Sequence, residues 1–95
     1  MIDGRGDHGY NQYRHAAKRM FERYGMAICR SEYERLCDQI VSGRNAPLGL
    51  GRGGGFVHRL NYRGREVYAI FRPDTKAIAT FLPAGRRQAE RAIQI

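Results

Sequence analysis

Residues 56–82 read FVHRLNYRGREVYAIFRPDTKAIATFL, and this stretch decides the fold class. Apolar, β-branched and aromatic residues alternate with polar ones, which is the pattern of half-buried strands. Arg63-Gly64 is a two-residue turn signal, because glycine readily adopts the positive φ of tight hairpins. Pro73-Asp74-Thr75 is a second turn, with proline suited to its first central position. Such short links join antiparallel strands, so the stretch predicts a meander with strands at 55–62, 65–72 and 76–82.

Two helices are predicted before the meander. The first has apolar residues at helical spacing from Tyr13 to Tyr24, including Phe21, and a glycine follows it. The second is expected to begin near Ser31, with Ser31 as the N-cap and Glu34 as its partner in a capping box. Its apolar residues follow the i, i+3, i+4, i+7 spacing that buries one face of a helix. The expected fold is therefore α+β, with two N-terminal helices packed on a three- or four-stranded antiparallel meander.

A chain of 95 residues has room for one small core, so a single domain is expected. Residues 1–12 are rich in glycine and charge and are predicted to form a flexible leader. The α+β domain covers residues 13–83 and contains a glycine-rich loop at 43–55, which we expect to be mobile. Residues 84–95 are a basic C-terminal tail, which either forms a short closing helix or frays.

The basic residues are unevenly distributed along the chain. The net charge is +8, and residues 1–42 contribute +1 while residues 43–95 contribute +7. All the basic residues except Lys18 and Lys76 are arginine. Arginine binds phosphate through two parallel hydrogen bonds and stacks on bases, which favours RNA or another nucleic acid as the partner. An anionic protein would satisfy the same charge, and a GC-rich genome would also favour arginine codons.

The sequence also bears on location and metal binding. No segment approaches the roughly 18 apolar residues of a membrane span. The N-terminus lacks the apolar stretch of a secretory signal, so we expect a cytoplasmic protein with no membrane partner. Cys29 lies at the start of the second predicted helix and Cys37 eight positions later, so within one helix they would be roughly 12 Å apart, too far for a disulfide. We expect both thiols to be free and buried. The spacing of cysteine and histidine residues does not match that of a zinc site, and we expect no metal or cofactor.

A group of polar residues lies opposite the apolar stripe of the first predicted helix. His15 and Arg19 are one turn apart, and Glu22 and Arg23 follow on the same side. An imidazole beside guanidiniums could position a phosphodiester and move a proton near neutral pH. A lone surface histidine is more often only a surface residue, and Glu22 could instead pair with Lys18 or Arg19 on the helix.

The predicted strands carry three further candidates. Arg72 and Thr80 fall on comparable faces if the register permits, where a guanidinium and a hydroxyl could hold the two free oxygens of a phosphate. Thr80 is equally suited to a strand as a β-branched residue. His58 alternates with apolar residues and is expected to be a half-buried core residue. Gly49–Gly54 matches the dinucleotide-binding pattern GxGxxG, but it joins a helix to a strand rather than a strand to a helix, which excludes that function.

The segment HAAKRMFERYG at 15–25, the second helix and the strands YRGREVYAIFRPDTKAIATFLP at 62–83 resemble toxin-like RNase domains. These belong to the barnase–EndoU–colicin–RelE-like superfamily, and the similarity is to its colicin-D-related branch. The resemblance implies a metal-independent endoribonuclease that acts by transesterification at the 2′-hydroxyl. It also implies that His15 is the general base or acid, that Arg19 stabilises the pentavalent phosphate, and that Thr80 and Arg72 contact the scissile group.

Two functions are therefore expected as alternatives. The first is a small toxin-like protein of a toxin–antitoxin module, phage or mobile element, which binds and could cleave RNA and has an acidic antitoxin as partner. Its nucleic-acid-binding residues would be Arg23, Arg44, Arg52, Arg59 and Arg72. The second is a non-catalytic inhibitor, encoded by a phage or mobile element, that docks its arginine-rich surface on a host complex that handles nucleic acids. The sequence leaves both functions open and does not predict the oligomeric state.

Overall fold

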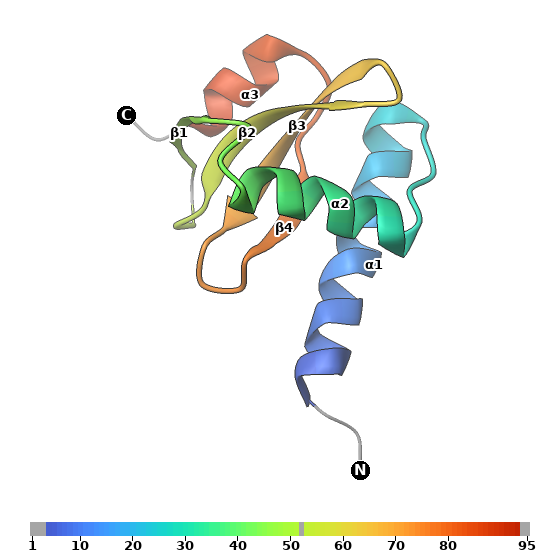
Figure 1. Cartoon of the computed structure of the whole chain (residues 1–95). Helices are drawn as coiled ribbons and strands as arrows, with labels where there is room; N and C mark the ends of the chain where they lie inside the picture. Colours follow the sequence, from blue (N-terminus) through green and yellow to red (C-terminus); the bar gives the residue numbers. More distant parts are fainter. Residues whose placement is uncertain (1–3, 52, 94–95) are drawn as a thin grey trace.

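The computed structural model describes residues 4–51 and 53–93 and has an α+β architecture (Figure 1). Its elements are α1 (Gly4–Tyr24), α2 (Arg30–Val41), β1 (Pro47–Leu50), β2 (Phe56–Tyr62), β3 (Arg65–Arg72), β4 (Ala77–Phe81) and α3 (Arg86–Ala92). The strands form one antiparallel sheet in the order β1-β2-β3-β4. Helices α1 and α2 pack on one face of the sheet, and α3 packs on the other. The predicted fold class is confirmed.

The meander follows the prediction closely, and the bounds of β2, β3 and β4 agree with it to within one residue. Arg63 and Gly64 both have positive φ, 52° and 76°, as a tight two-residue hairpin turn requires. The β3–β4 pairing contains a bulge, because Ile70 pairs with Thr80 whereas Phe71 pairs with Ile78. The extra residue in β4 sets which of its side chains face each side of the sheet.

The main core lies between the sheet and the first two helices. Ala16 and Met20 of α1 are fully buried, as are Ile78 and Phe81 of β4. The Tyr33 hydroxyl of α2 donates a 2.7 Å hydrogen bond to the Ile78 carbonyl oxygen, which ties the helix to this edge strand. Burial of these apolar side chains holds α1 and α2 in place over the sheet.

A smaller core occupies the opposite face. Val57, Tyr68, Leu82 and Ala89 are buried together there, with Ile70, Ala92 and Ile93 packed against them. Ala89 comes from α3, so the basic tail forms the closing helix that was one of its two expected states. In the described part of the chain, no helix combines the length and apolarity needed to cross a membrane.

The glycine-rich segment differs from the mobile loop predicted at 43–55. Pro47–Leu50 forms strand β1, which pairs with β2, and Gly51 forms a bridge with Ile93. A Cβ atom added to Gly55 would lie only 2.6 Å from Ile70 Cγ2. Glycine is therefore needed at this position for close packing, which a composition-based prediction of mobility overlooks.

The first helix begins at Gly4, so the part of the expected flexible leader from residue 4 to residue 12 is helical. Once packing fixes the segment around Ala16 and Met20 as a helix, each residue added toward the N-terminus gains a hydrogen bond without a new nucleation step. This end of α1 projects beyond the rest of the domain (Figure 1). Residues 1–3, the remainder of the predicted leader, lie outside the described residues.

The second helix begins at Arg30 with Cys29 as its N-cap, so the prediction of a Ser31–Glu34 capping box is wrong. The backbone N–H of Cys29 donates to Glu32 Oε1 at 3.2 Å, which is the same motif two residues earlier. This placement exposes the Cys29 thiol, contrary to the expected burial. Cys37 is buried as predicted, and both thiols are free.

Candidate nucleic-acid interface

The three residues expected to be catalytic do not converge on one site. His15 is exposed on α1, one turn from Arg19, whose Nη1 lies 2.8 Å from Glu22 Oε1. Thr80 pairs with Ile70, which packs on the α3 side of the sheet. Directly paired residues of an antiparallel sheet point to the same face, so Thr80 faces away from α1. The structure leaves His15 and Arg19 as neighbours and places the sheet between them and Thr80.

His58, the other histidine considered, is a core residue as predicted. Its side chain is only 4% exposed, and its ring lies edge-on to Phe71 with centroids 5.9 Å apart. Nδ1 is 3.0 Å from the main-chain oxygen of Asn45, so Nδ1–H is the donor. Burial lowers the pKa of His58 below its usual value near 6.5. A ring enclosed in this way cannot exchange protons with a substrate held at His15.

We expect the fold to lose stability on acidification because of His58. Its folded pKa is depressed, so the unfolded state binds the proton more readily below about pH 6.5, and stability falls as the pH drops from 7 toward 5. In His58→Asn an amide keeps a donor near Asn45 but does not titrate. The difference in unfolding free energy between the wild type and this variant should therefore narrow at low pH, as measured by urea denaturation. A difference that stays constant between pH 7 and pH 5 would contradict the assignment.

Two of the arginines expected to bind nucleic acid are engaged within the fold. The Arg23 Nη1 donates to the Phe81 carbonyl oxygen at 2.7 Å, which satisfies an acceptor of strand β4. Arg72 donates from Nη1 to the Gly53 oxygen at 3.1 Å and from Nε to Asp74 Oδ1 at 3.3 Å. These contacts give both guanidiniums a structural role.

The remaining predicted arginines do not form one surface. Arg44 is exposed in the connection that follows α2. Arg59 is exposed on β2, opposite Tyr68 in the register and therefore on the α3 side of the sheet, 3.7 Å from Glu66. Arg52 lies outside the described residues. The sequence shows that these positions carry arginine, but the tertiary fold decides whether the arginines share a surface.

A basic surface that the sequence analysis identified only at His15 lies on α1. Arg14, His15, Lys18 and Phe21 are exposed, and we call these four residues the α1 surface. Phe21 was assigned to the buried stripe, but its side chain is 65% exposed. Ala16, Met20 and Tyr24 already fill the side of the helix that faces the sheet, which leaves Phe21 at the margin. A stricter helical projection from the sequence could have placed Phe21 beside Lys18.

The α1 surface is hollowed and carries excess positive charge. A hollow of about 390 Å³ is lined by Tyr13, Arg14, Ala17, Lys18, Phe21, Ala27 and Ile28. Four basic side chains and one carboxylate occur between residues 11 and 24 of the helix. By contrast, α2 carries two basic and three acidic side chains. The excess of positive charge on this side of the molecule therefore comes from α1 and not from α2.

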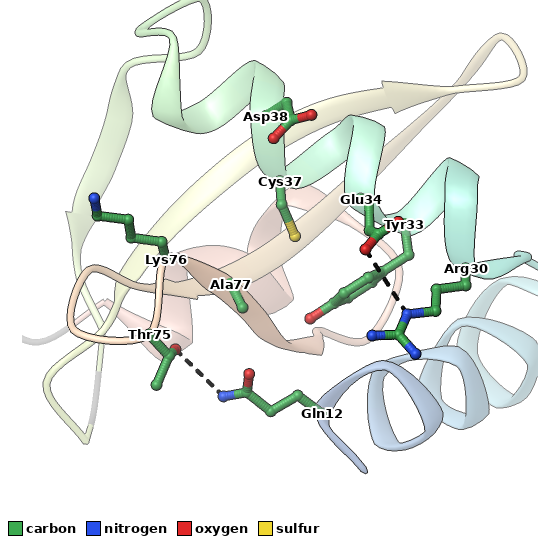
Figure 2. Close-up of a pocket in the computed structure, with 9 residues that line it drawn as sticks. All are labelled: Gln12, Arg30, Tyr33, Glu34, Cys37, Asp38, Thr75, Lys76 and Ala77. Carbon is green, nitrogen blue, oxygen red and sulfur yellow. Dashed lines mark hydrogen bonds and ion pairs between the residues drawn. The ribbon is translucent and has the colours of Figure 1, made fainter. Parts of the chain in front are cut away.

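A second cavity, of about 460 Å³, lies between α1, α2 and the β3–β4 turn (Figure 2). Gln12 Nε2 donates to Thr75 Oγ1 at 3.3 Å across one side of it. Its charged lining residues are Arg30, Lys76, Glu34 and Asp38. Two cations and two carboxylates leave no net charge, so the cavity has no electrostatic preference for an anion.

The thiol on the inner wall of this cavity is unreactive. Burial raises the pKa of the Cys37 thiol, which accepts a hydrogen bond from the Ile78 backbone N–H at 3.4 Å. A buried thiol of this kind stays protonated and is a poor nucleophile. Within residues 4–51 and 53–93, no three His, Cys, Asp or Glu side chains gather closely enough to hold a metal ion.

Comparison with models of protein families, with curated proteins and with solved structures finds no match for this chain. The resemblance to toxin-like ribonucleases therefore stays a prediction. The geometry of the α1 surface is the firmest guide to function, because it combines charge, an exposed aromatic ring and a hollow.

Proposed function

We propose that the protein binds single-stranded RNA through the α1 surface. The observation that carries this proposal is the exposed ring of Phe21, next to Lys18 on a hollow that Arg14 also lines. Proteins that bind single strands combine aromatic rings, on which bases stack, with cations that follow the backbone. Stacking of one base on such a ring contributes roughly 1–3 kcal/mol.

The dimensions of the surface suit a short single strand. From residue 14 to residue 21 the helix rises roughly 10 Å, at 1.5 Å per residue. Stacked nucleotides are spaced at roughly 3.4 Å, so about three nucleotides would cover this length. A paired duplex would not offer a base face to Phe21, because its bases are already stacked on one another.

We propose binding rather than cleavage as the activity. Transesterification without a metal ion works best with one group that accepts a proton and another that donates it. On the α1 surface His15 is the one candidate for proton transfer, and the nearby carboxylate of Glu22 is paired with Arg19. Thr80 and His58 lie elsewhere in the described structure, on the α3 side of the sheet and in the core.

The proposal predicts that Phe21→Ala weakens binding of a labelled oligouridine by roughly 5- to 150-fold, the loss of about 1–3 kcal/mol of stacking. Lys18→Ala should lower the slope of log affinity against log salt by roughly 0.7, the value for one lost phosphate contact. Fluorescence anisotropy at several salt concentrations measures both effects.

Matched controls test where the RNA binds. Leu48→Ala removes another exposed apolar side chain, and Arg35→Ala removes an exposed cation from α2. Neither change should alter oligouridine affinity by more than about two-fold, because neither residue belongs to the α1 surface. Equal losses in Phe21→Ala and Leu48→Ala would rule out stacking on Phe21.

A second candidate function, docking on a protein, is favoured by strand β1. It is an edge strand, and its Leu48 and Leu50 side chains are 44% and 45% exposed. The segment 46–51 carries no charge to discourage pairing with another strand. Such an edge can accept an extended peptide of a partner protein. This contact differs from the inhibitor expected from the sequence, which would dock its arginine-rich surface. Leu48→Ala then separates the functions, because it would weaken a protein complex while leaving RNA affinity unchanged.

A further inference from the structure

The sheet separates the α1 surface from a second group of cations. Helix α3 is anchored to the opposite face through buried Ala89, and its Arg86, Arg87 and Arg91 side chains are exposed. Arg59 projects from β2 on this same side. We call these four arginines the α3 surface.

The arginines of the α3 surface lie on one side of the sheet, because Arg59 pairs with Tyr68, which is buried with Ala89 of α3. Burial raises the pKa of the Tyr68 hydroxyl, and the positive charges of Arg59 and Arg86 both oppose that rise. Both guanidiniums therefore act on the same buried ring. Arg87 and Arg91 are one helical turn apart, which makes them neighbours on the exposed side of α3.

Carboxylates on this side neutralise the arginines only in part. Arg59 lies 3.7 Å from Glu66, and Arg86 lies 3.9 Å from Glu90. Both pairs are long and exposed, and exposed ion pairs contribute little, so a phosphate can replace the carboxylate readily. Arg87 and Arg91 have no carboxylate partner among the residues that the structure describes.

We propose that the α1 and α3 surfaces bind two separate segments of RNA, so that one protein molecule bridges them. This inference rests on the proposed function of the α1 surface. A short strand on one surface cannot reach the other, because the sheet and its two cores lie between them (Figure 1). Cation–phosphate contacts dominate on the α3 surface, where the described residues include no exposed large apolar side chain, so its RNA binding is independent of base identity.

The test uses two six-nucleotide oligouridines, one with a donor dye and one with an acceptor dye. Six stacked nucleotides span roughly 20 Å, so each is too short to wrap around the domain. The wild-type protein should bring the dyes together and produce energy transfer, with two oligonucleotides bound per monomer in analytical ultracentrifugation. Binding of one oligonucleotide per monomer would overturn the proposal.

Paired variants separate this proposal from the function on which it rests. Arg87→Ala/Arg91→Ala removes two of the cations that contact phosphate on the α3 surface, so it should abolish energy transfer and keep one bound oligonucleotide per monomer. The control Arg35→Ala/Arg44→Ala removes the same charge elsewhere and should keep energy transfer. If energy transfer survives in Arg87→Ala/Arg91→Ala, bridging through α3 is wrong. If Phe21→Ala leaves all binding intact, the α1 proposal fails instead.

Discussion

Replacing Phe81 with alanine should lower the free energy of unfolding by about 3–5 kcal/mol. Phe81 is fully buried on β4 in the core that α1 covers, so truncation leaves a cavity between helix and sheet. Domains of this kind have a total stability of about 5–15 kcal/mol, so the loss is a large share of it. Urea denaturation followed by circular dichroism measures the difference from the wild type.

The adjacent residue provides the control for Phe81. Thr80 is half-exposed and faces the other side of the sheet, so Thr80→Ala should change stability by less than about 1 kcal/mol. If Thr80→Ala were the more harmful change, the faces of β4 would be the reverse of those in the structure. Thr80 would then face α1, and the expected catalytic grouping with His15 would become possible.

The meander and the helices were predictable because their signals are local. Alternation with period two and the turn at Arg63-Gly64 depend on neighbours in sequence, and they placed three strands to within one residue. Strand β1 was not predictable in this way, because its pairing with β2 and the bridge from Gly51 to Ile93 join distant segments. The start of α1 depends on cooperative extension of a packed helix rather than on the residues at its end.

The candidate site was predictable only at the level of helix neighbours. The spacing of His15 and Arg19 correctly made them adjacent, since one helical turn sets it. The face of Thr80 depends on the bulge in β4, for which the sequence carries no clear turn or glycine signal. Arg23 is used to satisfy a strand carbonyl, an acceptor that exists only in the folded sheet. Residue type therefore indicated chemistry, while tertiary pairing decided which groups share a surface.

The glycine-rich segment supplies the second large expected effect. Gly55→Ala should lower the free energy of unfolding by about 1–3 kcal/mol, because the new methyl group would lie 2.6 Å from Ile70 Cγ2 and 3.0 Å from the Phe71 carbonyl oxygen. The carbonyl belongs to the β3 backbone, which cannot move aside without disturbing the sheet. Thermal denaturation of the purified variant provides the measurement.

Gly49 is the informative comparison, because a Cβ atom there would approach only side-chain atoms of one residue and no backbone atom. A Cβ atom there would lie 2.7 Å from Ile93 Cγ2, on a half-buried side chain just beyond the end of α3. A side chain in that position can shift, so Gly49→Ala should be less harmful than Gly55→Ala. A mobile loop, as the composition alone predicts, would tolerate alanine at both positions. Unequal losses would show instead that the glycines hold β1 and its turn against the sheet and against Ile93, the residue that follows α3.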